Sequence, residues 1–252
     1  MTALRRNLIL VAALVLLALP ALAEDFWFAQ ASDTHICDEV SAAVTREAIA
    51  MIDADERVDF SLWLGDITDR STRHEFELAR TTLSLSEKPW HPVRGNHDDD
   101  GGLYEEFFGP LNYVFEHAGW AFIMVDSNAS EPTLAEEARM AWLREQIALI
   151  DPETPIVLCC HHPLLLAGVV PLAGAPEIFE LFAGHNLKAV LAGHLHLNQE
   201  HVVNGVLHTV ATCLSPNRRN VDSDPRRGYR LFHCVDGQIT TQFVTVREVA
   251  EE

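Results

Sequence analysis

The sequence predicts one α/β domain, and three observations lead to this prediction. Apolar runs of strand length alternate with segments of helical periodicity through residues 26–192. From His201 onward only strand-like segments follow, and we expect them to pair antiparallel. Several predicted strands end in short clusters of Asp, Asn and His, at the edge where open α/β sheets hold their binding sites. The 252 residues contain no internal repeat and no low-complexity linker.

Hydrophobic periodicity places the elements of the first half. Apolar runs predict strands at 26–32, 58–64, 89–94, 113–116 and 120–126. Helices are expected at 39–53, 71–85, 103–108 and 132–150. The last of these has the clearest pattern, because Met140, Leu143 and Ile147 share one face among charged side chains. Gly65 ends the second strand and permits a sharp turn there.

Two buried strands and a group of late strands complete the predicted domain. The runs 155–160 and 188–192 are mostly apolar, as in strands that are buried on both faces. Residues 164–176 are rich in Gly, Pro and aliphatic side chains and are expected to form a loop before a short helix at 177–183. The late strands are expected at 202–203, 206–212, 228–235 and 238–246. Between them a polar loop carries four arginines, Arg218, Arg219, Arg226 and Arg227.

The composition fits a globular protein and disfavours one class of partner. Hydrophobic residues make up 48% of the chain, and the mean hydropathy of +0.04 suits a substantial core. The chain carries 37 acidic and 18 basic residues, and its net charge is −19. A nucleic-acid surface needs a basic patch, so we expect no nucleic-acid partner.

Residues 1–23 have the features of a secretory signal peptide, which leaves 24–252 as the domain. Arg5 and Arg6 precede an apolar run at 8–19 that is too short to span a bilayer comfortably. Ala21-Leu22-Ala23 then offers a small-x-small cleavage site. The alternative is an uncleaved anchor. We expect a periplasmic or secreted protein with no stable membrane insertion after cleavage.

The five cysteines form no C-x-x-C pair, so neither a zinc ribbon nor a redox motif is indicated. An exported protein can form disulfides, but an odd number leaves at least one cysteine outside any internal pair. We expect most of them to be small buried hydrophobic residues.

Five clusters of metal-ligand type stand at the ends of predicted strands. They are Asp33-Thr34-His35, Gly65-Asp66-Ile67-Thr68-Asp69, Gly95-Asn96-His97-Asp98, His161-His162-Pro163 and Gly193-His194-Leu195-His196. One Asp after a strand is usually a turn residue, but five such clusters favour a common site. Asp33 and His35 lie two apart on a segment expected to be extended, and would therefore face the same side.

Seven side chains from these clusters are candidate metal ligands. They are two carboxylates, one amide and four imidazoles: Asp33, His35, Asp66, Asn96, His161, His194 and His196. Seven ligands are too many for one tetrahedral ion and suit two ions that share a carboxylate, with Asp66 as the natural bridge. The set contains no thiolate, and it admits zinc, manganese or iron. Two ions about 3.5–4 Å apart can hold a hydroxide and clamp both the attacking and leaving oxygens of a phosphoester.

The order of the clusters resembles the calcineurin-like metallophosphoesterases, over about residues 26–246. The resemblance implies an α/β fold, a four-layer α/β/β/α sandwich of two mixed sheets flanked by helices. It implies that one ion is held by Asp33, His35, Asp66 and His196, and the other by Asp66, Asn96, His161 and His194. His97 would assist the leaving group or the phosphoryl oxygens, with Asp98 orienting it. Relatives with a His-x-Pro pattern use the first histidine, which favours His161 over His162; His162 would line the pocket or be structural.

Further segments resemble the cyclic-nucleotide-phosphodiesterase-like branch of this family. They are Phe108 to Tyr113, Asp126-Ser127, Trp142-Leu143 and Gly228-Tyr229-Arg230. Purple acid phosphatases carry a tyrosine where this chain has Asp69, which argues against an iron–tyrosinate centre. Asp69 is instead expected to brace the site through hydrogen bonds.

These features predict a metal-dependent phosphohydrolase, specifically a phosphodiesterase in which a metal-bridging hydroxide attacks phosphorus in line. The acidic surface repels polyanions, so a small phosphoester is the expected substrate. The four arginines of the late loop either gather an anionic substrate or form a solvated loop. The alternatives to this function are an exported phosphomonoesterase and a metal-binding relative without catalysis. The pattern favours no particular oligomeric state.

Overall fold

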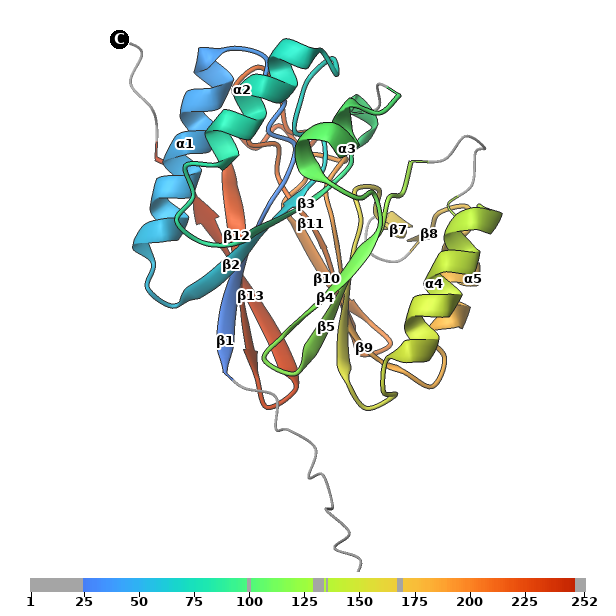
Figure 1. Ribbon diagram of the computed structural model, residues 1–252. Coiled ribbons are helices and arrows are strands. Elements are labelled where there is room, and N and C mark those ends of the chain that lie inside the picture. The colour runs from blue at the N-terminus through green and yellow to red at the C-terminus, as the bar shows by residue number, and fades with distance from the viewer. Residues whose placement is uncertain (1–24, 99–100, 129–133, 135, 167–169, 248–252) are drawn as a thin grey trace, which may run out of the picture.

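The structure is a computed structural model that describes residues 25–98, 101–128, 134, 136–166 and 170–247. The expected signal peptide at 1–23 lies outside the described residues. Two β-sheets lie face to face, and helices cover the outer side of each sheet (Figure 1). This arrangement confirms the predicted four-layer α/β/β/α sandwich.

The first sheet has the strand order β13-β12-β1-β2-β3. Its strands are β1 (Phe26–Ala31), β2 (Val58–Leu64), β3 (Trp90–Val93), β12 (Gly228–Val235) and β13 (Gln238–Thr245). The strands β1, β2 and β3 run parallel, whereas β12 is antiparallel to both β1 and β13. The helices on its outer side are α1 (Glu39–Ala54), α2 (Arg73–Leu83) and α3 (Leu103–Phe108).

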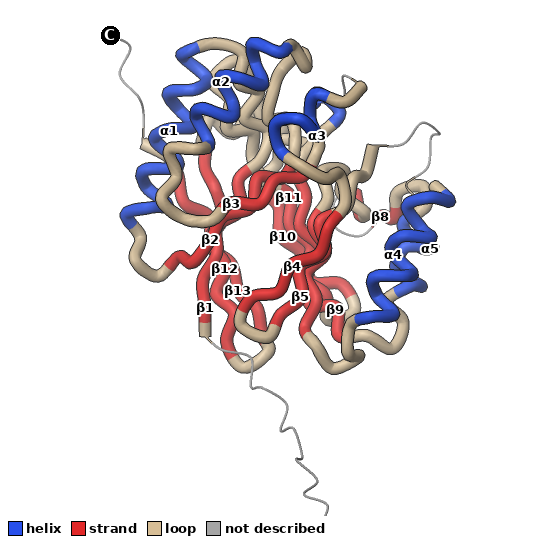
Figure 2. Tube along the Cα trace, in the orientation of Figure 1, coloured by secondary structure: helices blue, strands red, loops and turns tan. Residues whose placement is uncertain are grey.

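The second sheet has the order β10-β11-β9-β6-β5-β4. Its strands are β4 (Tyr113–His117), β5 (Trp120–Met124), β6 (Pro155–Cys159), β9 (Asn186–Ala192), β10 (Gln199–Val203) and β11 (Val206–Val210). The four central strands β5, β6, β9 and β11 are parallel. The helices α4 (Glu137–Leu149) and α5 (Ala175–Leu181) cover its outer side, and Figure 2 shows the strands gathered between the two groups of helices.

Three apolar layers hold the four structural layers together. The layer between the sheets is rich in aromatic rings, and Phe28 stacks on both Phe60 and Phe232. The other two layers lie between each sheet and its helices, around Trp63 and Phe76 on one side and Leu143 and Ile178 on the other. Burial of these faces supplies the main driving force for the sandwich.

A buried polar side chain of β1 links the two sheets next to the carboxyl ends of the strands. The buried Gln30 of β1 donates through Nε2 to the carbonyl of Ala192 in β9, at 2.8 Å. Its Oε1 accepts from Thr209 Oγ1 of β11, at 2.9 Å. Because buried polar groups need partners, these bonds favour one relative placement of the two sheets.

The structure differs from the predicted elements in three places. The segment expected as a loop at 164–176 contains a two-stranded hairpin, β7 (Leu165–Leu166) and β8 (Val170–Pro171), and α5 begins at Ala175. The helix expected at 132–150 begins at Glu137; residues 132, 133 and 135 of that range lie outside the described residues. The expected antiparallel pairing of the late strands is wrong for β11, because it pairs parallel with β9 as well as antiparallel with β10.

All five cysteines are free thiols, and four of them are buried. This fits the expectation that most are small hydrophobic residues. Among the described residues, no helix is both long and apolar enough to cross a membrane.

Replacing His91 with phenylalanine is expected to make the protein less sensitive to acid. The imidazole stacks on Phe115, with ring centroids 3.7 Å apart. Burial, helped by the charge of His117, lowers the pKa of His91 to about 4 from 6.5. As pH falls from 6.5 toward 4, His91 becomes protonated in the unfolded chain but stays neutral in the folded protein. The free energy of unfolding therefore decreases over this range. The phenyl ring of the variant can stack in the same way but does not titrate, so this decrease in unfolding free energy should disappear.

The measurement is urea unfolding of wild type and His91→Phe at about pH 7 and about pH 5. The wild type should lose more unfolding free energy between the two conditions than the variant does. His74→Phe, at an exposed position in α2, is the control and should behave like wild type. Equal losses in His91→Phe and wild type would contradict the prediction.

Candidate metal centre

The five clusters predicted from the sequence meet at one edge of the sandwich. They follow β1, β2 and β3 in the first sheet and β6 and β9 in the second. These strands are parallel within each sheet, so their carboxyl ends lie together. Backbone bonds join the clusters directly: His35 N donates to the carbonyl of Asp66 at 2.9 Å, and Gly193 N to that of His161 at 3.0 Å.

Five of the seven candidate ligands have a left-handed backbone. The φ angles are 55° at Asp33, 40° at His35, 49° at Asp66, 68° at His194 and 49° at His196. Non-glycine residues seldom adopt positive φ, and such residues concentrate at functional sites. Asp33 and His35 do face the same site, but the segment is not extended as expected. A left-handed turn aims both side chains at the site.

Asp33, His35, Asp66 and His196 form the first group, and their ligand atoms all lie within 4.8 Å of one another. His196 Nε2 lies 3.2 Å from Asp33 Oδ1 and 3.3 Å from His35 Nε2. His35 Nε2 lies 3.8 Å from Asp66 Oδ2. These are the four residues that the sequence resemblance assigns to one ion.

His161 and Asn96 stand on the other side of Asp66. His161 Nε2 lies 3.3 Å from Asp66 Oδ2 and 3.2 Å from Asn96 Oδ1. His161, His162 and His194 form a second group whose ligand atoms lie within 4.8 Å of one another. Asp66 Oδ2 thus faces both the first group and His161.

Carbonyl acceptors fix the orientation of three of the imidazoles. The Nδ1 of His161 donates to the carbonyl of Leu64 at 2.8 Å, and that of His196 to the carbonyl of Arg219 at 3.2 Å. A carbonyl accepts only, so each Nδ1 carries a proton and Nε2 is the atom directed at the site. His97 is held in the same way by the carbonyl of Asp69, at 2.6 Å. Such outer contacts are what metal-ligating histidines ordinarily have.

The spacing of these atoms fits metal ligands. Nitrogen and oxygen ligands at about 2.0–2.2 Å from one ion lie about 3–3.6 Å from each other. The pairs of His196 with Asp33 and His35 span 3.2–3.3 Å, and so do the pairs of His161 with Asp66 and Asn96. The donors are carboxylate, amide and imidazole groups, and both carboxylates, Asp33 and Asp66, are buried. Zinc, manganese and iron all accept such a set of ligands.

Contacts with the two aspartates raise the pKa values of two of the imidazoles. Burial opposes a charge on His161, but the hydrogen bond and negative charge of Asp66 outweigh it and raise the pKa of His161 to about 9. Burial likewise opposes a charge on His196, and its contact with Asp33 raises the pKa to about 11. In contrast, burial lowers the pKa of His35 to about 4 and that of His162 to about 3. At neutral pH, His161 and His196 are therefore the charged pair.

Metal binding at neutral pH is expected to release one proton from each of His161 and His196, whatever other ligands contribute, because a ligating nitrogen must lose its proton. Affinity should therefore rise with pH, by about tenfold per released proton for each pH unit below these pKa values. Calorimetric titration in buffers of different ionisation enthalpy counts the protons. His196→Ala should release one fewer. Release that is unchanged by this substitution would contradict the assignment.

Two glycines of the motifs are required by close approach. A Cβ on Gly95 would collide with the backbone and carboxylate of Asp66. A Cβ on Gly193 would collide with Ser32 Oγ and Asp33 Oδ2. The glycines before Asn96 and before His194 therefore let the neighbouring loops close onto the two aspartates.

His97 and Asp98 are both at the site, but their relation differs from the expected one. Asp98 is fully buried and accepts from the backbone N–H groups of Ile67, Thr68 and Gly95. The carbonyl of Asp69, and not the carboxylate of Asp98, holds the ring of His97. Burial and the charge of Asp66 raise the pKa of Asp98 to about 6. Asp98 shapes the loop that carries Asp66 and does not orient the imidazole, because its oxygens are already taken by backbone donors.

His162 lies within the site and is half-buried. Its ring is 4.2 Å from that of His194, and its Nδ1 is 2.9 Å from Ser127 Oγ. The Oγ of Ser127 also accepts from the His162 backbone N–H, at 2.9 Å. Ser127 thus orients His162 toward the second group, and the placement favours a pocket residue over a purely structural one.

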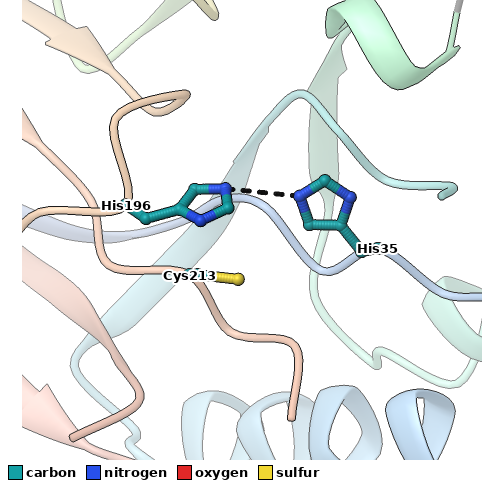
Figure 3. A group of neighbouring side chains, drawn as sticks. All are labelled: His35, His196 and Cys213. Carbon is teal, nitrogen blue, oxygen red and sulfur yellow. Dashed lines mark hydrogen bonds between the residues drawn. The ribbon is translucent and has the colours of Figure 1, made fainter. Parts of the chain in front are cut away.

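Cys213 is a neighbour of the site that the sequence did not indicate. Its side chain lies beside His35 and His196 (Figure 3), and the sulfur and one nitrogen of each histidine lie within 4.8 Å of one another. It follows β11 in a segment, 211–215, with no motif of its own. Gln30 was missed too, although a lone amide in an apolar strand was a usable signal.

The four arginines of the late loop have different roles. Arg218 donates to Asp69 Oδ1 from Nε at 3.0 Å, which places its guanidinium at the site. Asp69 Oδ1 in turn lies 3.4 Å from His35 Nδ1, so Asp69 braces the site as expected. Arg227 donates to four carbonyls of its own loop, and Arg226 pairs with Asp224 on the surface. Arg219 is exposed and offers its backbone carbonyl to His196.

Comparison with known proteins gives related sequences. The sequence model of the calcineurin-like phosphoesterase family matches residues 26–198. The chain is 26% identical over 216 residues to the probable glycerophosphodiester phosphodiesterase of Arcobacter nitrofigilis, over 75% of this chain and 78% of that protein. It is 27% identical over 248 residues to the probable cyclic nucleotide phosphodiesterase of Rhodococcus erythropolis, over 84% and 81%. It is 24% identical over 221 residues to tartrate-resistant acid phosphatase type 5 of Sus scrofa, over 69% and 64%.

Solved structures share the fold. GAP50, the anchor in the inner membrane complex of Plasmodium, has a TM-score of 0.68 at 15% identity, over 89% of this chain and 85% of that chain. Purple acid phosphatase PPD1 from yellow lupin has a TM-score of 0.66 at 11% identity, over 90% and 52%. The sequence relatives include the phosphodiesterases of the predicted branch. Because the family model spans more than half of the sequence, the chain belongs to the calcineurin-like phosphoesterase family of metal-dependent hydrolases.

Proposed function

We propose that this protein is a phosphodiesterase that hydrolyses small phosphodiesters at a centre of two metal ions. The observation that carries the proposal is the position of Asp66, whose Oδ2 lies 3.3 Å from His161 Nε2 and 3.8 Å from His35 Nε2. One carboxylate thus stands between two groups of ligand-type side chains, as a bridge between two ions requires. The relatives with phosphodiesterase names support the diester as substrate.

In this proposal Asp33, His35, Asp66 and His196 hold one ion, and Asp66, Asn96, His161 and His194 hold the other. When bound, the ions would polarise the phosphoester and lower the pKa of water, which supplies hydroxide as the nucleophile near neutral pH. Asp66 is kept in place by the backbone N–H of His97, which donates to Oδ1 at 2.8 Å. The ring of His97 donates through Nδ1 to the carbonyl of Asp69 at 2.6 Å, so it exchanges protons through Nε2. His97 is accordingly the group that protonates the departing oxygen.

Hydrolysis of bis(p-nitrophenyl) phosphate, compared with that of p-nitrophenyl phosphate, tests the proposal. Metal-stripped protein is titrated with manganese, zinc or iron, and both rates are followed. A diester preference that returns with two ions per chain supports the proposal. A monoester preference would replace it with phosphomonoesterase activity, which the similarity to acid phosphatases favours as the second candidate. Two bound ions with no turnover of either substrate would favour a metal-binding relative without catalysis.

The substrate is proposed to be small and anionic. The net charge of −19 disfavours long polyanions, whereas the guanidinium of Arg218 stands at the site beside Asp69. A single phosphoester can approach this one cation without meeting the acidic surface over a long stretch. Cyclic nucleotides and glycerophosphodiesters, the classes in the names of the relatives, are the proposed substrates.

Replacing Arg218 with alanine is expected to raise KM by about tenfold, because a charge-assisted hydrogen bond to the phosphoester contributes about 1.5 kcal/mol. The Arg218→Lys variant should recover part of the loss by keeping the charge. Arg226→Ala is the matched control in the same loop, since its guanidinium pairs with Asp224 away from the site. Steady-state kinetics with the diester gives the values. An equal effect of the two alanine substitutions would contradict a contact between Arg218 and substrate.

Export is proposed from the signal-peptide features of residues 1–23. The exported enzyme would then act on phosphoesters outside the cytoplasm. Mass spectrometry of the protein recovered from the periplasm or the medium tests this. A mature chain that begins at Glu24 supports cleavage after Ala23. An intact leader in a membrane fraction would instead indicate an anchor.

A further inference from the structure

The side chain of Cys213 lies beside two members of the first group of ligands, His35 and His196. It is 1% exposed and stands in the segment that follows β11. Its sulfur and one nitrogen each from His35 and His196 lie within 4.8 Å of one another, and Figure 3 shows Cys213 next to the two facing imidazoles. Asp33 and Asp66 gather on the same two histidines.

The backbone carbonyl that accepts the thiol proton of Cys213 has enough donors without it. The sulfur donates to the backbone carbonyl of Asp33 at 3.2 Å. That carbonyl also accepts from the backbone N–H groups of Leu214 at 3.1 Å and Ser215 at 3.2 Å. A carbonyl has two lone pairs, so these two amides satisfy it without the thiol. The proton can leave without exposing an unpaired buried oxygen.

We propose that Cys213 supplies a thiolate to the ion held by Asp33, His35, Asp66 and His196, and that this sulfur makes the position prefer zinc to manganese. The inference rests on the proposed two-ion centre and goes beyond it by naming an eighth ligand and the metal it selects. On binding, the S–H bond breaks, a zinc–sulfur bond forms, and the proton passes to solvent. No oxidation or reduction takes place.

The chemistry of the donors supports this selection. Carboxylate oxygens suit magnesium and manganese, whereas thiolate sulfur suits zinc and other thiophilic ions. The sulfur would join two imidazoles and two carboxylates, and thiolate together with imidazole is a donor combination that zinc sites use. Among the cysteines of the described residues, Cys213 is the one that stands in a candidate ligand group. Cys234, in contrast, is buried between the sheets in β12.

Cobalt is the first probe, because a cobalt–thiolate bond produces a sulfur-to-metal charge-transfer absorption in the near ultraviolet. Metal-free wild type, Cys213→Ser, Cys213→Ala and Cys234→Ala are each titrated with Co²⁺. The band should appear in wild type and in Cys234→Ala, and both Cys213 variants should lack it. A wild type that binds cobalt without this band, or a band that persists in Cys213→Ala, would overturn the inference.

Competition between zinc and manganese is the second measurement. Loss of the sulfur should lower zinc affinity by about 100-fold and change manganese affinity by less than about threefold. Equal losses for both metals in Cys213→Ser would indicate a packing role and overturn the inference. Failure of wild type to bind any ion would remove the proposed centre itself, whereas ions bound without sulfur contact would remove only the role of Cys213.

Discussion

Replacing Asp66 with alanine is expected to remove the metal ions and lower turnover by about a thousandfold or more, because bound ions contribute several kcal/mol of transition-state stabilisation. The carboxylate is 2% exposed and faces His161 and His35 through Oδ2, while Oδ1 accepts from the backbone of His97. Metal analysis after dialysis and diester hydrolysis are measured on the same sample.

Asp59→Ala is the matched control, since Asp59 is an exposed carboxylate of the same strand, β2. It should keep both metal and activity. Asp66→Asn retains the shape but loses the charge, and it should bind metal weakly. The role of Asp66 is contradicted if Asp66→Ala keeps its metal content or turns over diester at a rate near that of wild type.

Replacing His97 with alanine is expected to lower kcat by about 10²- to 10⁴-fold while metal content stays near the wild-type level, as for the loss of a general acid. The ring donates to the carbonyl of Asp69 and contacts the ring of His35 edge-on, with centroids 4.7 Å apart. The contact with Asp66 is made by the backbone N–H of residue 97 and survives the substitution. His97→Ala should therefore lose turnover but keep its metal content, whereas Asp66→Ala should lose both.

The leaving group gives a sharper measurement of the role of His97. A p-nitrophenolate departs readily without a proton, but an alkoxide does not. The rate loss in His97→Ala should therefore be smaller for bis(p-nitrophenyl) phosphate than for an alkyl diester. Equal losses for both substrates would assign His97 to binding of the phosphoryl oxygens instead of proton transfer.

The clusters themselves could be predicted because local pattern determines them. A mostly apolar run such as Val58–Leu64 predicts a buried strand, so the polar residues that follow it are expected at the end of that strand. Parallel pairing then brings the ends of β1, β2 and β3 to one edge. Gly65, with a φ of 86°, also follows from a local need to turn, whereas Gly95 and Gly193 are required by the approach of Asp66 and Asp33 from distant parts of the chain.

Other features depended on contacts between segments far apart in the chain. His97 is oriented by Asp69 through a carbonyl, and no sequence pattern distinguishes this carbonyl from the carboxylate of Asp98. The parallel pairing of β11 with β9 follows from its place in the second sheet, not from its own residues. Arg218 reaches Asp69 across 149 positions, while the similar Arg226 does not.

The sequence by itself determined the α/β class, the helical and strand-forming segments and seven candidate ligands, because periodicity and strand ends are local properties. Only the tertiary structure decided how these residues meet. The left-handed turns at Asp33 and His35, the placement of Asp66 between two groups and the arrival of Cys213 beside His196 all arise when two sheets close on each other. Packing selects these arrangements because their strained backbones and buried charges are stable only when every neighbouring segment is in place.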